Sequence, residues 1–235
     1  MVLNILVSCN DAEKNRVPKV YTVSAMKKVM WSGELEGKVR MDTLQQPGYY
    51  GLGPESFLKG ELLLWNGTAY TSRYATDSTM TVQKNATATA PFFVYSHVKE
   101  WDSLPLPSHF RNAKELETFL LNHVKDSATP FGFQLKGTIE TATIHVQNLP
   151  EGTQVRSPQE AHQGQVNYVL EHTPVTILGF FSTKHQGVFT HHDSFLHLHL
   201  MTKDQTFMGH VDEVLFHSQG MMVYLPKGME ISSKK

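Results

Sequence analysis

The segment FLHLHLMTKDQTFMGH runs from Phe195 to His210. Leucines and histidines alternate in its first half, and a short polar interval, TKDQ, separates this half from a second apolar stretch that ends at His210. Alternation of period two is typical of a β-strand that buries one face. The pattern predicts a hairpin whose leucines face the core, while His197 and His199 face the other way. Depending on where the turn is centred, either His197 or His199 lies opposite His210. All three imidazoles share one face of the hairpin in both registers.

Three imidazoles on one face of a two-stranded ribbon form a candidate metal site. Directly opposed Cβ atoms lie about 4.5–5.5 Å apart, which lets imidazole nitrogens converge on one ion at about 2.0–2.1 Å. Three protein ligands leave coordination positions open, as in a catalytic rather than a structural site. Imidazole ligands suit zinc, and nickel, copper or iron are compatible with them. The alternative interpretation is an amphipathic strand with solvated histidines, because an HxH pair on a half-exposed strand is common.

Thirteen histidines accompany a single cysteine among the 235 residues, and this composition limits the kind of metal site. One cysteine excludes an internal disulfide and a cysteine-based zinc cluster. The formal net charge of -1 gives no electrostatic footprint for nucleic acid or an anionic membrane. Any metal ion is therefore expected to be held by His, Asp or Glu. We expect three other histidines near the hairpin, His191, His192 and His217, to be surface residues.

Near the start of the chain, a short apolar run ends with LVSC at Cys9. This ending resembles a bacterial lipobox. Two interpretations stay open: a lipid-anchored extracytoplasmic protein whose true start lies upstream, or a chance match in a cytoplasmic protein. We expect residues 1–18 to be a leader or tether. Residues 19–235 then form the main domain, with a boundary between two β-rich halves near 150–166. No apolar run is long enough for a transmembrane helix.

The segment GELLLWNGTAYTS, residues 60–72, predicts a second hairpin. Asn66 and Gly67 are the preferred pair for a type I′ turn. With that turn, Glu61 shares its face of the strand with two large apolar side chains. A carboxylate in such a position is either a solvated strand-end residue or an acid with a raised pKa.

One strong helix is predicted over residues 111–125, where Asn112 and Glu115 form a capping-box pair. Residues 73–90 are rich in Ser, Thr and Ala without clear periodicity, and we expect a loop there. Strands dominate the remaining sequence. The fold class predicted is α+β, with mixed or antiparallel β-sheets, two or three helices, and the metal site on a β-hairpin.

Six motifs occur in the order GLG, GELLLWNGTAY, PFFVYSH, FQLKGTI, TILGFF and HLHLMTKDQTFMGHV. In this order the sequence resembles the α-acetolactate decarboxylase family over roughly residues 20–226. The histidine hairpin followed by valine is the most specific part of the resemblance, and GEL before an Asn-Gly turn is the second.

The resemblance implies a metal-dependent carboxy-lyase that converts 2-acetolactate, a 2-hydroxy-3-oxo acid, into acetoin and CO₂. It implies His197, His199 and His210 as ligands of Zn²⁺ or another divalent transition metal, which polarises the keto and hydroxyl oxygens of the substrate. The family carboxylate in the GEL motif falls on Glu61, which is expected to deliver the proton. The resemblance also implies a homodimer.

The sequence departs from the family pattern at three places, one of which is Pro54, where the family often has a small hydroxyl residue. An arginine that is thought to meet the substrate carboxylate aligns with His145, whose imidazole can donate a hydrogen bond but lacks the bidentate fork of a guanidinium. The family also has a longer C-terminal tail with a second glutamate, and we assign that role to no residue here, Glu230 included. Two other functions fit the same residues: a metal-dependent hydrolase of esters or lactones, and a non-catalytic, lipid-anchored metal- or ligand-binding protein.

Overall fold

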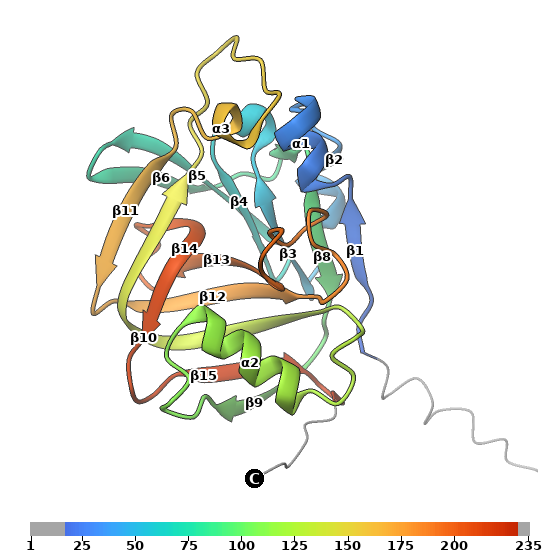
Figure 1. Ribbon diagram of the computed structural model, residues 1–235, viewed down its shortest axis with the longest axis vertical. Coiled ribbons are helices and arrows are strands. Elements are labelled where there is room, and N and C mark those ends of the chain that lie inside the picture. Colours follow the sequence, from blue (N-terminus) through green and yellow to red (C-terminus); the bar gives the residue numbers. More distant parts are fainter. Residues whose placement is uncertain (1–16, 230–235) are drawn as a thin grey trace, which may run out of the picture.

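The computed structural model describes residues 17–229, so that Cys9 and Glu230 lie outside the described part of the chain. Within it, two large antiparallel β-sheets lie face to face with three helices around them (Figure 1). The predicted α+β class, with antiparallel sheets and histidines on a hairpin, is confirmed. The expected domain limits stay a prediction. Residues 17–229 contain no helix with the length and hydrophobicity needed to cross a membrane.

The first sheet is built from the N-terminal part of the chain, and its strands follow the order β1-β8-β3-β4-β5-β6. Their bounds are β1 Val20–Val23, β3 Tyr49–Pro54, β4 Glu61–Trp65, β5 Thr68–Thr76, β6 Thr79–Lys84 and β8 Phe93–His97. A separate two-stranded ladder joins β2 Val39–Arg40 to β7 Thr89–Ala90.

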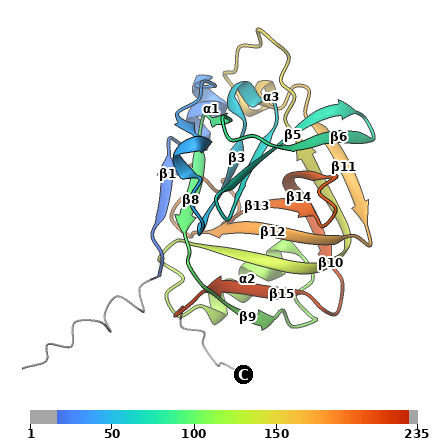
Figure 2. The ribbon, with the colours of Figure 1, turned by 180° about the vertical axis from the view of Figure 1, so that it is seen from behind.

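The second sheet is organised around one long strand, β10 Phe131–Val146, which pairs with four other strands along its length. Its order is β12-β13-β14-β10-β15-β9, and β11 pairs with β10 beside this path. The bounds are β9 Trp101–Pro105, β11 Val166–Glu171, β12 Pro174–Phe181, β13 Leu196–Thr202, β14 Met208–Phe216 and β15 Met222–Pro226. Seen from behind, β12 and β10 run across the strands of the first sheet (Figure 2).

The longest helix, α2 Ala113–His123, covers the outer face of the second sheet (Figure 1). The Asn112 side chain accepts a hydrogen bond from the Glu115 N–H, and the Glu115 carboxylate accepts one from the Arg111 N–H. The predicted cap at this end of the helix is therefore confirmed. Two shorter helices, α1 Met26–Ser32 and α3 Pro158–Ala161, lie together at one end of the molecule. Single 3₁₀ turns occur at Met41–Leu44 and Ser56–Leu58.

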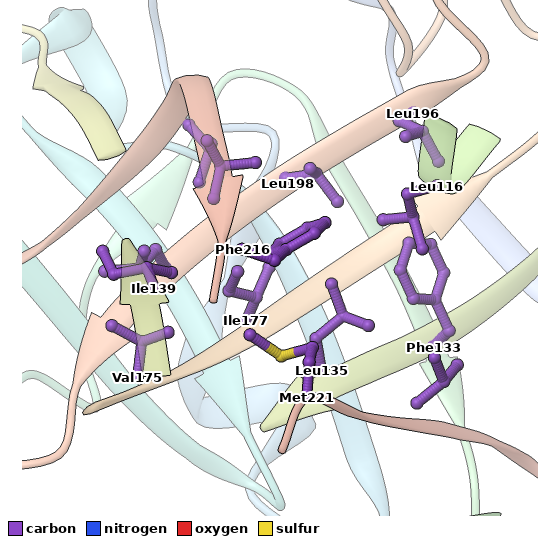
Figure 3. Close-up of a cluster of buried hydrophobic side chains, with 14 of the residues drawn as sticks. Leu116, Phe133, Leu135, Ile139, Val175, Ile177, Leu196, Leu198, Phe216 and Met221 are labelled. Atoms are coloured by element: carbon purple, nitrogen blue, oxygen red, sulfur yellow. The ribbon is translucent and has the colours of Figure 1, made fainter. Parts of the chain in front are cut away.

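The main hydrophobic core lies between α2 and the second sheet (Figure 3). Leu196, Leu198 and Leu200 of β13 are buried in this core together with Leu116 of α2 and Phe216 of β14. Burying leucine side chains in this way contributes about 1.5–3 kcal/mol each. The leucine face of the histidine hairpin is therefore fixed toward α2, which turns the histidine face toward the first sheet.

The hairpin predicted around Asn66 and Gly67 forms between β4 and β5. Both turn residues have positive φ, 48° and 78°, as a type I′ turn requires. The expected loop over residues 73–90 is wrong, because β5 continues to Thr76 and β6 follows. From residue 73 to residue 84, most side chains are exposed on both faces of the strands. This explains the missing apolar periodicity.

Candidate metal centre

The three hairpin histidines lie together on the inner face of the second sheet. His199 pairs directly with His210 across β13 and β14, which is the second of the two predicted registers. His197 lies two residues before His199 and therefore shares its face. One ring nitrogen from each of the three residues lies within 4.8 Å of the other two. The predicted convergence of the three imidazoles is present in the structure.

The histidine face is buried, not solvated. The exposed fractions of His197, His199 and His210 are 2%, 0% and 7%. Further along the same two strands, Met201 and Met208 pack in one cluster with residues of the first sheet. The alternative of incidental histidines in water is therefore wrong, because the first sheet covers this face of the hairpin.

These side chains fit a divalent metal ion. His197 Nδ1 and both ring nitrogens of His199 are buried without a hydrogen-bond partner in the described residues, although buried polar groups are ordinarily paired. Burial lowers the pKa of all three imidazoles, to about 3 for His199. Neutral imidazoles have a lone pair to offer, so the set is suited to ligation at neutral pH.

Glu61 brings a carboxyl group to the histidines from the opposite sheet. It is the first residue of β4 and is 2% exposed. Its Oε2 lies 3.6 Å from His199 Nε2, and its Oε1 accepts a hydrogen bond of 3.3 Å from the Gln147 N–H. Burial raises the pKa of Glu61 well above its usual range, although the hydrogen bond from Gln147 opposes this effect. A raised pKa favours the neutral carboxylic acid.

His145 extends the row of imidazoles across the sheet. It lies on β10 directly opposite His210, and their ring centroids are 4.7 Å apart. His145 is 6% exposed. Its Nδ1 lies 2.8 and 2.9 Å from the two carboxylate oxygens of Asp212, which therefore accept the Nδ1–H. This contact fixes the ring and leaves Nε2, which is 3.3 Å from Gln147 Nε2, on the other edge of the imidazole.

Further residues at the centre were not expected from the sequence. His191, predicted to be a surface histidine, has its Nε2 3.2 Å from His210 Nε2, so that prediction is wrong. Burial lowers the pKa of His191 as well. Asp212 could have been found, because it follows His210 by two residues on one strand and period two places both on one face. No local pattern indicates His191, because the loop between β12 and β13 carries it. The exposed fraction of His192 and His217 agrees with the prediction of surface residues.

Two cavities meet at the centre. The inner one has a volume of about 30 Å³ and lies against Glu61, His145 and His197. The outer one, of about 390 Å³, lies between the start of α2, residues 191–194 and the hairpin. His191 and His210 line both cavities.

Comparison with known proteins places the chain in a family. The sequence model for alpha-acetolactate decarboxylase matches residues 20–232. A protein named alpha-acetolactate decarboxylase from Brevibacillus brevis is 24% identical over 220 residues, which are 92% of this chain and 72% of that protein.

Two solved structures share the fold. The acetolactate decarboxylase of Bacillus subtilis subspecies spizizenii gives a TM-score of 0.72 at 20% identity, covering 91% of this chain and 86% of that chain. The second is a protein of unknown function from Staphylococcus aureus that is described as similar to alpha-acetolactate decarboxylase. Its TM-score is 0.74 at 16% identity, covering 91% of this chain and 86% of that chain.

Proposed function

Because the chain belongs to the alpha-acetolactate decarboxylase family, we propose that it decarboxylates 2-acetolactate to acetoin and CO₂. The observation that carries this proposal is the convergence of three buried imidazoles next to a buried carboxyl group with a raised pKa. Metal ligands and acid come from opposite sheets. The fold thus brings together residues that are far apart in the sequence.

We propose His197, His199 and His210 as the residues that hold a divalent ion, with zinc as the first candidate. When bound, such an ion supplies a Lewis acid that polarises the ketone oxygen of a β-keto acid and favours the loss of CO₂. The three imidazoles contribute neutral nitrogen donors, because burial lowers the pKa of each. Their position on two paired strands keeps them on one face.

Glu61 is the proposed proton donor. After CO₂ leaves, the carbon that carried the carboxylate needs a proton, and a neutral carboxylic acid can deliver it. Burial favours the protonated form of Glu61. The side chain is also held in place, since the Gln147 N–H donates to Oε1 while Oε2 faces His199. A fixed donor protonates one face of the carbon, which gives a single stereoisomer.

His145 is the proposed contact for the substrate carboxylate, in the place of the family arginine. Donation from Nε2 while Asp212 accepts from Nδ1 requires an imidazole with a proton on both nitrogens. One donor atom then replaces the two of a guanidinium, so weaker binding of the carboxylate is expected.

The same pair of residues supports a second candidate function. An imidazole that is held by a carboxylate at Nδ1 and lines the cavity beside the hairpin histidines is also suited to act as a general base that activates water. A metal-dependent hydrolase of esters or lactones would use His145 in this way.

The deciding experiment measures acetoin and CO₂ from 2-acetolactate, and acid release from a panel of esters and lactones, with zinc-loaded protein. The decarboxylase proposal predicts acetoin from the wild type and none from His197→Ala. Ester or lactone hydrolysis without acetoin would support the hydrolase. Full acetoin formation by His197→Ala would contradict the assignment of the metal ligands.

A further inference from the structure

The inner cavity is too small for the proposed substrate. A cavity of about 30 Å³ has room for about two water molecules, whereas a branched hydroxy-keto acid is several times larger. Part of its wall is fixed, because Glu61, His145, His197 and His210 lie on paired strands of the two sheets, while the rest of the wall, His191 included, lies outside these strands. Part of the remaining wall therefore has to move before a substrate can reach the three hairpin histidines.

The outer cavity offers the space that the inner one lacks. It measures about 390 Å³ and lies beside Lys114 and Glu117 of α2. His191 and His210 belong to the walls of both cavities, so these two imidazoles separate them. Removing one of these rings would join the small cavity at the metal centre to the large one.

His191 is the movable member of this pair. His210 lies on β14, which is paired on both sides, with β13 and with β10. His191 lies in the segment between β12 and β13, outside any strand. The 3.2 Å contact between the two Nε2 atoms is the hydrogen bond that holds the His191 ring against the metal centre. The ring can turn away without breaking either sheet.

We propose that His191 is a specificity-determining residue that closes the metal centre toward the outer cavity and turns aside to admit the substrate. The inference rests on the proposed function for the presence of a metal ion and for the class of substrate. A 2-hydroxy-3-oxo acid then enters the metal centre through the outer cavity. The size of the acid that is accepted then depends on the side chain at position 191.

The test measures how fast a chelator removes zinc from the loaded protein, a readout that does not need turnover. Four proteins are compared: wild type, His191→Ala, His191→Phe and His192→Ala. His192 is the matched control, because it is the next residue and is exposed. The phenylalanine variant keeps an aromatic ring of similar size but lacks the nitrogen that contacts His210. Thermal unfolding of each loaded variant confirms that it is folded.

We expect zinc removal from His191→Ala to be at least about threefold to tenfold faster than from the wild type, the effect of losing one neutral hydrogen bond. His192→Ala should match the wild type, and His191→Phe should fall between wild type and His191→Ala. For a 2-hydroxy-3-oxo acid bulkier than acetolactate, we expect His191→Ala to lower KM more than it lowers the KM for acetolactate. We expect kcat to change little.

The two proposals fail in different ways. Equal zinc-removal rates in wild type, His191→Ala and His192→Ala would overturn the role of His191 and leave the proposed function intact. Faster removal from His191→Ala in a protein that forms no acetoin would support His191 and contradict the decarboxylase. A folded wild type that takes up no divalent metal would overturn both.

Discussion

Glu61 Oε2 lies 3.6 Å from His199 Nε2, and the two residues come from opposite sheets. Both side chains are buried, with exposed fractions of 2% and 0%. The contact therefore exists only when the two sheets close on each other. Acid and metal-ligand candidates are assembled by the tertiary fold, and each can be tested apart from the other.

Replacing Glu61 by Gln should separate proton delivery from metal binding. The amide has the same shape but no acidic proton, so acetoin formation should fall by about 10²–10⁴, the usual contribution of a general acid. Zinc content should stay at the wild-type level, because the imidazoles are unchanged. Steady-state rates and metal analysis of the same samples test both parts. A Glu61→Gln protein with the wild-type rate would exclude Glu61 as the proton donor.

Replacing Asp212 by Asn should weaken the contact proposed for His145. The carboxylate accepts from His145 Nδ1 at 2.8 Å, and a charge-assisted hydrogen bond of this kind is worth about 1.5–3 kcal/mol. A rise in KM for acetolactate of about tenfold to hundredfold is expected, with a smaller change in kcat. Glu213→Gln is the matched control, because Glu213 is the next residue and is exposed. An unchanged KM in Asp212→Asn would contradict the role of this pair.

Metal-free protein should lose stability as the pH falls below about 6.5, the pKa of histidine in an unfolded chain. Burial lowers the pKa of His199 in the folded state to about 3. Below pH 6.5 the unfolded chain therefore binds the proton more readily, and the loss continues down to about pH 3. The slope for one such group is about 1.4 kcal/mol per pH unit.

Urea unfolding in the presence of a chelator measures this slope, and His199→Gln is the comparison. Glu61 acts in the opposite direction, because its raised pKa makes the folded state bind the proton more readily. Because Glu61 contacts His199, the comparison is repeated in the Glu61→Gln background, which removes that opposing effect. Identical slopes in the two proteins would contradict a strongly lowered pKa at His199.

Replacing Gly209 by Ala should disturb the centre through the backbone. A Cβ at this position would lie 2.5 Å from the backbone oxygen of His145, and a backbone atom cannot turn aside as a side chain can. Strand β14 would have to move away from β10, which displaces the neighbouring His210. We expect a loss of about 1–3 kcal/mol in the free energy of unfolding, as for other overpacked sites. Zinc affinity should fall as well, which calorimetry measures.

Much of the candidate metal site follows from local geometry and could be predicted from the sequence. Period two places His197 and His199 on one face, and a short turn returns His210 to the same face in either register. Glu61 is different, because nothing in the strand before the Asn66 turn shows which sheet will cover it. The family resemblance supplied that residue, and the structure places its carboxylate beside His199.

The features that were missed depend on tertiary contacts. His191 belongs to an irregular segment, so no periodicity indicates its direction, and its contact with His210 appears only in the folded chain. In the strands between residues 73 and 84, Met80 is the one buried side chain, and burial therefore leaves no alternating pattern in the sequence. The burial of the histidine face likewise requires the first sheet, which is far away along the chain.

The most direct test of the central proposal is acetoin formation from 2-acetolactate before and after removal of the metal ion. A chelator-treated protein should form no acetoin, and addition of zinc or another divalent transition metal should restore the original rate. His199→Ala should stay inactive after the same addition. Equal acetoin formation by the stripped and the reloaded protein would contradict a metal-dependent decarboxylase at the three histidines.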